Sequence, residues 1–259
     1  MLLAADIGNT EITLGVFRGE RMEGHWRLTT VAERTPDEWA ALLTLYLSQA
    51  GRSPQEVRAA VMASVVPMVA GELGAGIAQA CDVVPVDVGP SSPLPITLDV
   101  DEPLTVGADR VVNTLAAFTF YHRDTVVVDF GTATTFDCIT ADGRFIGGVI
   151  APGIRTGADQ LIRRTAKLPA AALVVPDRVI GRRTEACIQA GVMLGAAEAV
   201  SGLLRRIGEE WPGGGRPYVV ATGGLAPLIA VHVPAIDAVE SRLTLMGLRV
   251  AAQHLGLRW

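Results

Sequence analysis

The feature that most constrains this chain is a short pattern that occurs twice. An apolar run at residues 2–5 leads into Asp6-Ile7-Gly8-Asn9-Thr10, and a second one at residues 126–128 leads into Asp129-Phe130-Gly131-Thr132. Further apolar residues follow each glycine-containing turn, so each pattern predicts a tight hairpin with a carboxylate at the end of its first strand. The repeat indicates an internal duplication of one fold unit, with domains at residues 1–119 and 120–259.

The tip of such a hairpin has two interpretations that residue type alone does not separate. Asp, Gly and Asn are ordinary turn residues, so Asp6 and its neighbours could simply build a β-turn. Backbone N–H groups, hydroxyls and one carboxylate are also what a phosphate tail with its metal requires. The second copy at Asp129 favours the phosphate interpretation, because two such tips could grip one nucleotide.

The rest of the chain predicts an α/β protein. After a third strand near residues 22–28, Thr35-Pro36-Asp37-Glu38 has the composition of a helix start, and Gly51 is expected to end that helix. The strands and helices expected beyond it alternate, as in an α/β fold. The expected strands are 57–66, 83–88, 96–100, 125–130, 136–139, 145–150 and 218–221. The expected helices are 68–80, 107–118, one after Gly153, 184–207 and 243–255, and residues 167–183 are expected to form a lid-like loop.

Composition excludes several classes of function. With 259 residues, 49% of them hydrophobic and 19% charged, the chain can bury a large core and is not disordered. The net charge of −5 and the scattered basic residues argue against a nucleic-acid partner. There is no long uninterrupted apolar run and no readable signal peptide, so we expect neither a membrane span nor export.

Cysteine and histidine give no support to a metal centre or a hydrolase triad. The three cysteines, Cys81, Cys138 and Cys187, are far apart in apolar surroundings, and we expect reduced core residues in a cytoplasmic protein. The four histidines are equally dispersed.

Nucleotide binding, if it occurs, must use the hairpins. Neither a Walker A sequence nor a Gly-x-Gly-x-x-Gly sequence is present. A glycine pair in Thr222-Gly223-Gly224-Leu225 supplies a strand-to-helix turn that could back onto a nucleoside. A further segment, Gly107-Ala108-Asp109-Arg110, opens a helix. Its Asp109 is either a first-turn acid favoured by the helix dipole or a general base, and Arg110 is either a surface residue or a bidentate anion ligand.

Together these segments resemble the acetate and sugar kinase/Hsp70/actin superfamily, and within it the type III pantothenate kinases. Individually each match is weak, but their order and spacing along nearly the whole chain are specific. The matching segments are Asp6 to Thr10, Ser64-Val65-Val66-Pro67, Gly107 to Arg110, Asp129 to Thr135, Gly147-Gly148 with Pro152-Gly153, Thr184, and Thr222 to Leu225. The resemblance implies two duplicated ribonuclease H-like domains of the actin-like ATPase fold, each with a mixed sheet flanked by helices.

The resemblance also implies a reaction and roles for individual residues. The reaction is ATP-dependent phosphorylation of pantothenate to 4'-phosphopantothenate, the first step towards coenzyme A. Asp109 is expected to be the general base, and Asp6 to lie on the magnesium side of ATP. The residues expected to contact the nucleotide are Asp6, Ile7, Gly8, Asn9, Thr10, Glu11, Ile12, Thr13 and Thr132. Those expected to contact pantothenate are Gly107, Ala108, Asp109, Arg110 and Thr184.

Two further expectations come from the same resemblance. Asp129 resembles the ligand of a monovalent cation, K⁺ or NH₄⁺, required besides Mg²⁺. In relatives the substrate pocket is completed across a homodimer, so Thr184 and the loop before it could serve the neighbouring subunit.

One departure from the family pattern concerns the acceptor. Many relatives carry an aromatic pocket residue just before the segment equivalent to Gly107, and this chain has Glu102-Pro103-Leu104-Thr105-Val106 there. Two alternatives therefore stay open: a kinase for another small hydroxylated acid, and a non-catalytic regulatory or accessory protein on the same fold. The presence of Asp6, Asp109 and Asp129 weighs against the second.

Overall fold

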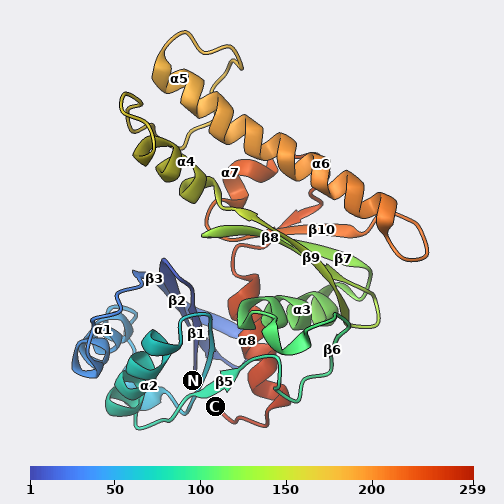
Figure 1. Cartoon of the computed structure of the whole chain (residues 1–259). Coiled ribbons are helices and arrows are strands. Elements are labelled where there is room, and N and C mark those ends of the chain that lie inside the picture. Colours follow the sequence, from blue (N-terminus) through green and yellow to red (C-terminus); the bar gives the residue numbers. More distant parts are fainter. The chain divides into compact units, whose positions relative to one another are not determined.

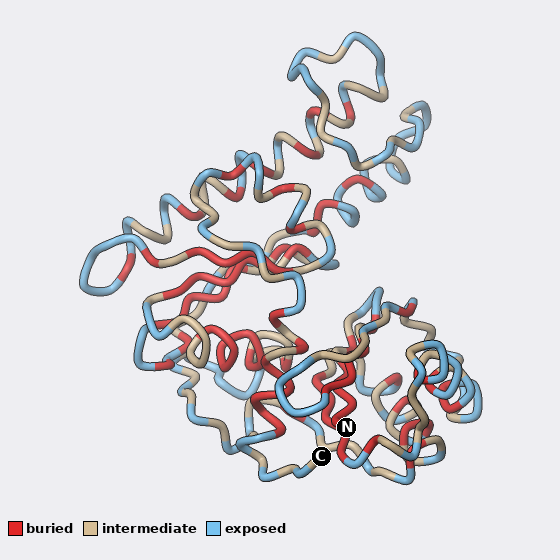
Figure 2. Tube along the Cα trace, turned by 180° about the vertical axis from the view of Figure 1, so that it is seen from behind, coloured by how far each residue is buried: buried red, intermediate tan, exposed pale blue.

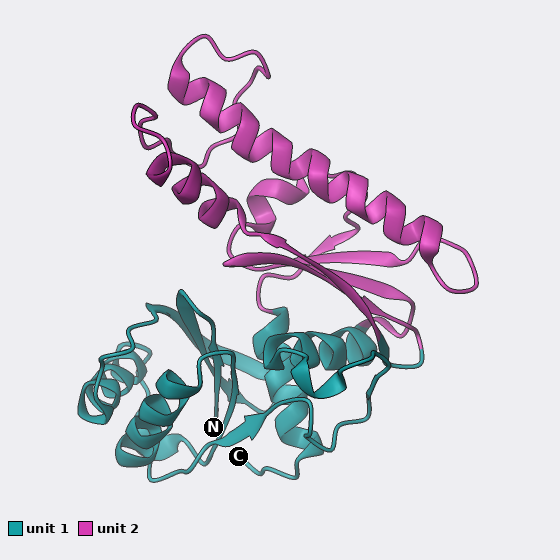
Figure 3. Ribbon diagram, in the orientation of Figure 1, with its two compact units in different colours: residues 1–120, 142–145, 243–259 teal, residues 121–141, 146–242 magenta.

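The chain is divided into two compact units. A computed structural model describes residues 1–259. Unit 1 comprises Met1–Phe120, Asp142–Phe145 and Leu243–Trp259, and unit 2 comprises Tyr121–Ala141 and Ile146–Arg242 (Figure 3). The C-terminal segment was expected with the second half of the chain, but it groups with unit 1.

Unit 1 is built on a five-stranded mixed sheet (Figure 1). Its strands lie in the order β3-β2-β1-β4-β5, with β1 antiparallel to β2 and parallel to β4. The expected three-stranded meander and the two following strands are confirmed, although β5 is shorter than expected. The strands are β1 (Leu2–Ile7), β2 (Glu11–Arg18), β3 (Arg21–Thr29), β4 (Ala59–Ser64) and β5 (Val86–Val88).

Helices cover both faces of this sheet. Alternate residues of β1 point to opposite faces, so Leu3, Ala5 and Ile7 enter one buried cluster while Leu2 and Ala4 enter another. The first cluster is covered by α1 (Pro36–Gln49) and α2 (Pro67–Cys81). The second is covered by α3 (Ala108–Tyr121) and α8 (Leu243–His254). Figure 2 shows these buried stretches in red along the strands and the inner faces of the helices.

The apolar character of α8 explains why it belongs to unit 1. Leu245 and Leu248 are at most 1% exposed and pack in the cluster of Leu2 and Ala4. Gly247 lets the helix approach α3, because a Cβ atom there would lie 2.6 Å from the carbonyl oxygen of Val112. Without α8, one face of the unit 1 sheet would expose these apolar side chains to water.

The first helix begins as its sequence predicts. The Thr35 hydroxyl accepts from the backbone N–H of Glu38, and the Glu38 carboxylate accepts from the backbone N–H of Thr35 at 2.8 Å. This reciprocal capping satisfies two N–H groups that a helix start would otherwise leave without partners.

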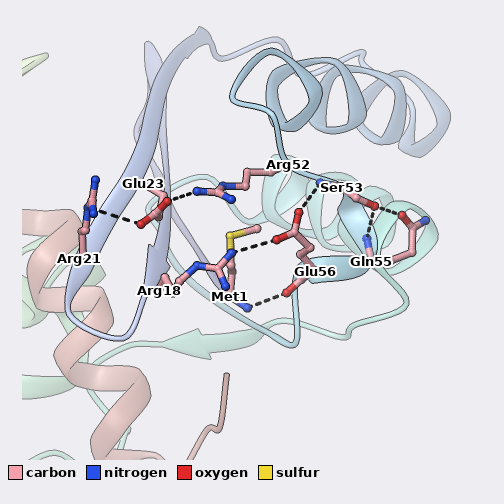
Figure 4. Close-up of polar contacts among 8 residues, drawn as sticks. All are labelled: Met1, Arg18, Arg21, Glu23, Arg52, Ser53, Gln55 and Glu56. Atoms are coloured by element: carbon pink, nitrogen blue, oxygen red, sulfur yellow. Dashed lines mark hydrogen bonds and ion pairs between the residues drawn. The ribbon is translucent and has the colours of Figure 1, made fainter.

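A polar cluster ties the beginning of unit 1 to the short helix η1 (Pro54–Glu56) (Figure 4). The α-amino group of Met1 donates to the carbonyl oxygen of Glu56 at 2.6 Å, and Arg18 pairs with the Glu56 carboxylate at 3.0 Å. The hydrogen bond from the backbone N–H of Ser53, and after it the hydrogen bond from Arg18, hold the pKa of Glu56 below its usual value. Arg52 and Arg21 both pair with Glu23 on β3, which ties the same corner to the sheet.

Unit 2 repeats the strand plan of unit 1. Reading β9-β8-β7-β10-β11 reproduces β3-β2-β1-β4-β5, with β7 antiparallel to β8 and parallel to β10. The duplicated α/β fold expected from the paired motifs is therefore confirmed. The strands are β7 (Thr125–Phe130), β8 (Ala133–Ile139), β9 (Arg144–Pro152), β10 (Tyr218–Thr222) and β11 (Ala238–Val239). The sheet continues to β6 (Thr97–Leu98), which pairs with the first two residues of β9.

Four helices of unit 2 pack on a single apolar cluster built around Val128, Phe130 and Phe136. They are α4 (Ile154–Arg163), η3 (Ala190–Leu194), α6 (Gly195–Glu210) and α7 (Ala226–Ala230). The helix α5 (Thr184–Gln189) leads into η3. The loop expected at 167–183 contains neither helix nor strand.

The long helix of unit 2 differs in detail from the expected one. It runs from Thr184 to Glu210 and contains a π-helical stretch at Ala190–Leu194. By length and composition alone it could cross a membrane, and a third of its most apolar window is buried. Four of its buried residues, Met193, Ala197, Val200 and Leu204, belong to the core of unit 2.

The expectation that all three cysteines are core residues is wrong for one of them. Cys81 and Cys138 are buried, but Cys187 is exposed. It lies on α5, where its thiol donates to the carbonyl oxygen of Gly181 at 3.4 Å. The first turn of α5 is polar and follows directly on the loop, so the side chain of Cys187 faces solvent and not the apolar interior.

Candidate active site

The first hairpin places Asp6 at the end of the central strand of unit 1. Asp6 pairs with Thr13 across β1 and β2, and the N–H of Gly8 donates to the carbonyl oxygen of Glu11 at 3.0 Å to close the turn. Asp6 is half-buried, whereas Asn9 and Thr10 are exposed. The tip thus presents short polar side chains and backbone to solvent beside a partly shielded carboxylate.

Not every residue expected to contact nucleotide can do so with its side chain. Ile7 and Ile12 are at most 1% exposed, and both side chains lie in the core cluster beneath α1 and α2. These two residues would contribute backbone groups only. Glu11 is exposed and lies 3.8 Å from Arg27.

The segment Gly107 to Arg110 lies at the same end of the unit 1 sheet. The N–H of Val65, just after β4, donates to the carbonyl oxygen of Ile7 at 3.1 Å. A Cβ atom on Gly107 would lie 3.7 Å from the side chain of Val65. Val65 therefore links the end of β1 to the start of α3, and it brings Asp109 to the edge of the sheet that carries Asp6.

The Asp109 carboxylate is held in a tight and partly dehydrated setting. Its Oδ1 accepts from the backbone N–H of Arg110 at 2.9 Å. A Cβ atom on residue 107 would lie 2.5 Å from the same oxygen, so glycine is required there. Burial raises the pKa of Asp109 above its usual value, and the N–H and charge of Arg110 oppose that rise only in part. A carboxylate with a raised pKa is a better proton acceptor.

Arg110 is positioned by an aromatic ring. Its guanidinium lies over the ring of Phe145, 4.9 Å from the centroid, in the geometry of a cation–π contact. Its carbonyl oxygen accepts from the Thr114 hydroxyl at 2.8 Å in the next turn of α3. The planar cation is thus held beside Asp109, where it could bind a carboxylate or phosphate through two hydrogen bonds.

The second hairpin has the same construction in unit 2. Asp129 pairs with Thr135 across β7 and β8, and the N–H of Gly131 donates to the carbonyl oxygen of Ala133 at 3.0 Å. Asp129 is half-buried, and Thr132 is exposed at the tip. Asp129 and Thr132 therefore belong to one hairpin, as the repeated pattern predicted.

Two glycines pack against this hairpin. The sequence placed Gly223 in a turn behind a nucleoside and Gly153 in a segment matching the family, but it gave neither a contact with the Asp129 hairpin. Gly223 follows β10 with φ of +88°, and a Cβ atom there would overlap the Asp129 carboxylate. Gly153 precedes α4, and a Cβ atom there would lie 2.5 Å from the carbonyl oxygen of Gly131. Each glycine directly follows a strand, in a segment that matches the family pattern, and this position was the sequence signal for a close approach to the backbone.

Thr184 is the first residue of α5 and is exposed. The loop before it folds onto the same helix, since the thiol of Cys187 donates to the carbonyl oxygen of Gly181 at 3.4 Å. Gln189 further along α5 donates to the carbonyl oxygen of Ala172 at 3.2 Å. The loop thus has defined anchors on the helix that carries Thr184.

The carboxylates of the two hairpins suit metal ions that bind mainly to the phosphates of a nucleotide. No group of three or more His, Cys, Asp or Glu side chains is arranged as an all-protein cage. Mg²⁺ in phosphoryl-transfer sites typically binds one or two carboxylates together with substrate phosphates. One half-buried carboxylate at each hairpin, Asp6 and Asp129, meets that requirement.

Comparison with known proteins agrees with this arrangement. The profile of the family described as type III pantothenate kinase matches residues 2–206. A type III pantothenate kinase of Moorella thermoacetica is 44% identical over 254 residues, covering 98% of this chain and 99% of the relative. One of Roseiflexus castenholzii is 48% identical over 250 residues, covering 96% and 97%. The chain belongs to the type III pantothenate kinase family.

Membership makes the protein an ATP-using kinase, in agreement with its motifs. Among solved structures, one described as a Baf family transcriptional activator from Campylobacter jejuni matches with a TM-score of 0.63 at 17% identity, covering 98% of both chains. The activator of a 2-hydroxyisocaproyl-CoA dehydratase from Clostridium difficile, with bound ADPNP, matches with a TM-score of 0.56 at 12% identity, covering 98% and 93%. At these identities the structures support only the fold. A non-catalytic role is not favoured because the sequence relatives, matched over nearly their whole length, are described as kinases.

Proposed function

We propose that this kinase uses Asp109 as the general base that activates the primary hydroxyl of pantothenate. The reaction of the family is ATP-dependent phosphorylation of pantothenate to 4'-phosphopantothenate, the first step of coenzyme A biosynthesis. The observation that carries the assignment of Asp109 is its position. It is a partly buried carboxylate of raised pKa, linked through Gly107 and Val65 to the strand end that bears Asp6.

The chemical step needs little covalent participation by the protein. As the pantothenate oxygen attacks the γ-phosphorus, its bond to phosphorus forms, the bond to the β–γ bridging oxygen breaks, and ADP leaves. Asp109 takes the hydroxyl proton, and Arg110 beside it would bind the pantothenate carboxylate or a phosphate oxygen. The rest of catalysis is positioning and neutralisation of charge.

Each hairpin would bind phosphate or metal with groups of its own unit. In unit 1, Asp6 would hold Mg²⁺ directly or through water, and the backbone of Gly8 to Thr13 would contact phosphate oxygens. In unit 2, Asp129 would bind K⁺ or NH₄⁺, and the exposed Thr132 would contact phosphate. The bound cations would neutralise charge on the phosphates.

We also propose a cytoplasmic homodimer in which the long helix of unit 2 lies at the interface. This helix is apolar, yet only a third of its most apolar window is buried within the chain. On its outer side, side chains added at Gly191, Gly195 or Gly202 would meet nothing within 4 Å. A second copy could approach closely there, and Thr184 at the start of the same helix would then contact pantothenate bound by the partner.

The acceptor is tested with purified protein, ATP, Mg²⁺ and K⁺, with pantothenate compared against a panel of small hydroxylated acids. We expect 4'-phosphopantothenate and a preference for pantothenate. The panel matters because Leu104, which stands where many relatives have an aromatic residue, is 72% exposed. Turnover of another acid but not of pantothenate, with either K⁺ or NH₄⁺, would replace the proposed acceptor. Absence of any transfer would remove the catalytic assignment.

A further inference from the structure

In unit 1, the tip of the phosphate-side hairpin is bound from outside by one threonine. Thr30 follows the last residue of β3, and its hydroxyl donates to the carbonyl oxygen of Gly8 at 2.7 Å. The backbone N–H of Thr30 donates to the carbonyl oxygen of Thr10 at 3.0 Å. Two carbonyl groups of the turn are therefore fixed by a residue that lies outside the Asp6 motif.

In unit 2, the corresponding tip is bound in a similar way. The hydroxyl of Thr156, in the first turn of α4, donates to the carbonyl oxygen of Thr132 at 2.7 Å. The backbone N–H of Gly153, directly after β9, donates to the same oxygen at 3.1 Å. Here too one hydroxyl and one N–H converge on the tip, and both come from the segment that follows the third strand of the meander.

The two contacts occupy equivalent places in the duplicated fold. In each unit the segment after the third strand supplies a threonine hydroxyl to a main-chain oxygen of the first hairpin, at 2.7 Å in both cases. The donors differ in local structure, because Thr30 follows a strand directly and Thr156 sits on a helix. Both hydroxyls donate to a hairpin carbonyl oxygen at the same distance, although the two threonines lie in different local structures. This favours a shared role over chance.

We propose that Thr30 and Thr156 are positioning residues that hold the two hairpins in the conformation needed to bind the phosphates of ATP. The proposal rests on the proposed function of those hairpins. Each tip contains glycine and is solvent-exposed, so it would otherwise sample many conformations that place its N–H groups wrongly. Both hydroxyls also occupy carbonyl oxygens of the tips, and a carbonyl turned towards a phosphate would repel it. Fixing these groups before ATP binds lowers the cost of binding and of reaching the transition state.

A merely structural role is the competing explanation, and the chain offers matched controls for it. The Thr44 hydroxyl donates to the carbonyl oxygen of Ala40 at 2.8 Å within α1. The Thr165 hydroxyl donates to that of Leu161 at 2.9 Å at the end of α4. Both are threonine-to-carbonyl bonds of similar length that touch neither hairpin. Replacement of any of the four residues by valine removes a hydroxyl and keeps the shape of the side chain.

The experiment compares Thr30→Val, Thr156→Val, Thr30→Ser and Thr156→Ser with Thr44→Val and Thr165→Val in the full chain. For each variant, kcat, the KM for ATP and the KM for pantothenate are measured, together with the urea midpoint of unfolding. We expect each hairpin valine variant to lose about tenfold in kcat/KM for ATP, the order of one hydrogen bond, with the KM for pantothenate changed by less than about twofold. The serine variants should recover to within about threefold of the wild type.

The double variant Thr30→Val/Thr156→Val extends the test. Since the two residues share no partner, their effects should multiply to about a hundredfold loss in kcat/KM for ATP. Three outcomes would each overturn the proposal. The hairpin variants could lose no more activity than Thr44→Val and Thr165→Val, or lose activity only in proportion to the fall in the urea midpoint. The serine variants could also be as impaired as the valine variants.

A binding measurement separates this proposal from the proposed function. Titration of a non-hydrolysable ATP analogue with Mg²⁺ reports the hairpins even if pantothenate is not the acceptor. Weaker binding in the valine variants, with no phosphorylation of pantothenate by the wild type, would keep the positioning role and reject the acceptor. Unchanged binding and unchanged kcat/KM for ATP in the valine variants of an active kinase would reject the positioning role alone.

Discussion

Gly223 lies directly against the carboxylate of Asp129, and no side chain fits between them. Its φ of +88° is one that residues with a side chain rarely adopt, and a Cβ atom there would also lie 2.7 Å from the backbone nitrogen of Phe130. A glycine directly after β10 is therefore needed for the Asp129 carboxylate, near the end of β7, to keep its observed position. This relationship gives a direct test of the role of Asp129.

We predict that Gly223→Ala will lower kcat at least tenfold and raise the K⁺ concentration needed for half-maximal activity. The methyl group would displace the Asp129 carboxylate that we propose as the cation ligand. Gly215→Ala is the control, because Gly215 has a similar φ of +95° with nothing within 4 Å of an added Cβ atom. It should share the backbone strain and keep the K⁺ dependence. Equal behaviour of the two variants would attribute the loss to strain and not to the carboxylate.

We predict that Asp109→Asn will abolish most turnover and make the protein more resistant to urea at neutral pH. Burial raises the pKa of Asp109 in the folded state, so folding favours its protonated form. Its contribution to stability is full below the unfolded pKa and is lost as the pH rises through the folded pKa, so the ionised group destabilises the fold at neutral pH. An amide removes that cost, and the exposed Asp101→Asn is the control. Near-normal kcat in Asp109→Asn would exclude Asp109 as the base.

The same raised pKa predicts a pH dependence of catalysis. A base must be deprotonated to accept the hydroxyl proton, so kcat/KM for pantothenate should fall on the acid side through a pKa higher than that of an ordinary aspartate. The pH profile of kcat/KM measures it, because this ratio reports the pKa of the free enzyme. In the slow Asp109→Asn variant this acid limb should be absent, and its persistence there would assign it to another group.

We predict that Arg110→Lys will raise the KM for pantothenate at least tenfold with a smaller effect on the KM for ATP. Lysine cannot form the planar, two-bond contact with an anion, and it stacks less well on the ring of Phe145. Arg123, whose guanidinium lies 5.0 Å from the ring centroid of Tyr218, provides the matched control Arg123→Lys. A selective rise in the KM for ATP would instead place Arg110 on the nucleotide.

We predict that Gly195→Arg will convert a dimer into a monomer, as measured by light scattering after size-exclusion chromatography. Arginine at this outer position of α6 has room within one chain but would keep a second copy at a distance. Gly208→Arg, near the end of the same helix, should remain dimeric. If Thr184 acts across the interface, the monomer will also bind pantothenate more weakly. A wild-type monomer, or a Gly195→Arg dimer, would contradict the proposed interface.

The sequence predicted the parts of the fold whose physical cause is local. The cap at Thr35, the turns after Asp6 and Asp129 and the repeated meander were all predicted from residue type and spacing, and the structure confirms them. The π-helical stretch at Ala190–Leu194 was not predictable, because the hydrophobic pattern of the helix continues through it. The two-residue strand β11 and the five-residue α7 are too short to produce a periodic signal.

Site residues that belong to a sequence motif could be predicted. Site residues that are brought into place only by the packing of the chain could not. Asp6, Asp109 and Asp129 stand in recognisable contexts, and each lies at a strand end or helix start as expected. Thr30 and Thr156 carry no signal, since a threonine after a strand or in a first helical turn is ordinary. Only the three-dimensional course of the chain brings their hydroxyls to Gly8 and Thr132. The exposure of Cys187 likewise depends on how the preceding loop folds onto α5.

The role of Asp109 as the base depends on its distance from the pantothenate hydroxyl. A crystal structure of the kinase with pantothenate and a non-hydrolysable ATP analogue gives the distance from the primary hydroxyl oxygen to the nearer Asp109 carboxylate oxygen. We expect a hydrogen-bond distance of about 2.6–3.2 Å. A bound pantothenate whose hydroxyl contacts a different base, with Asp109 beyond hydrogen-bond reach, would contradict it.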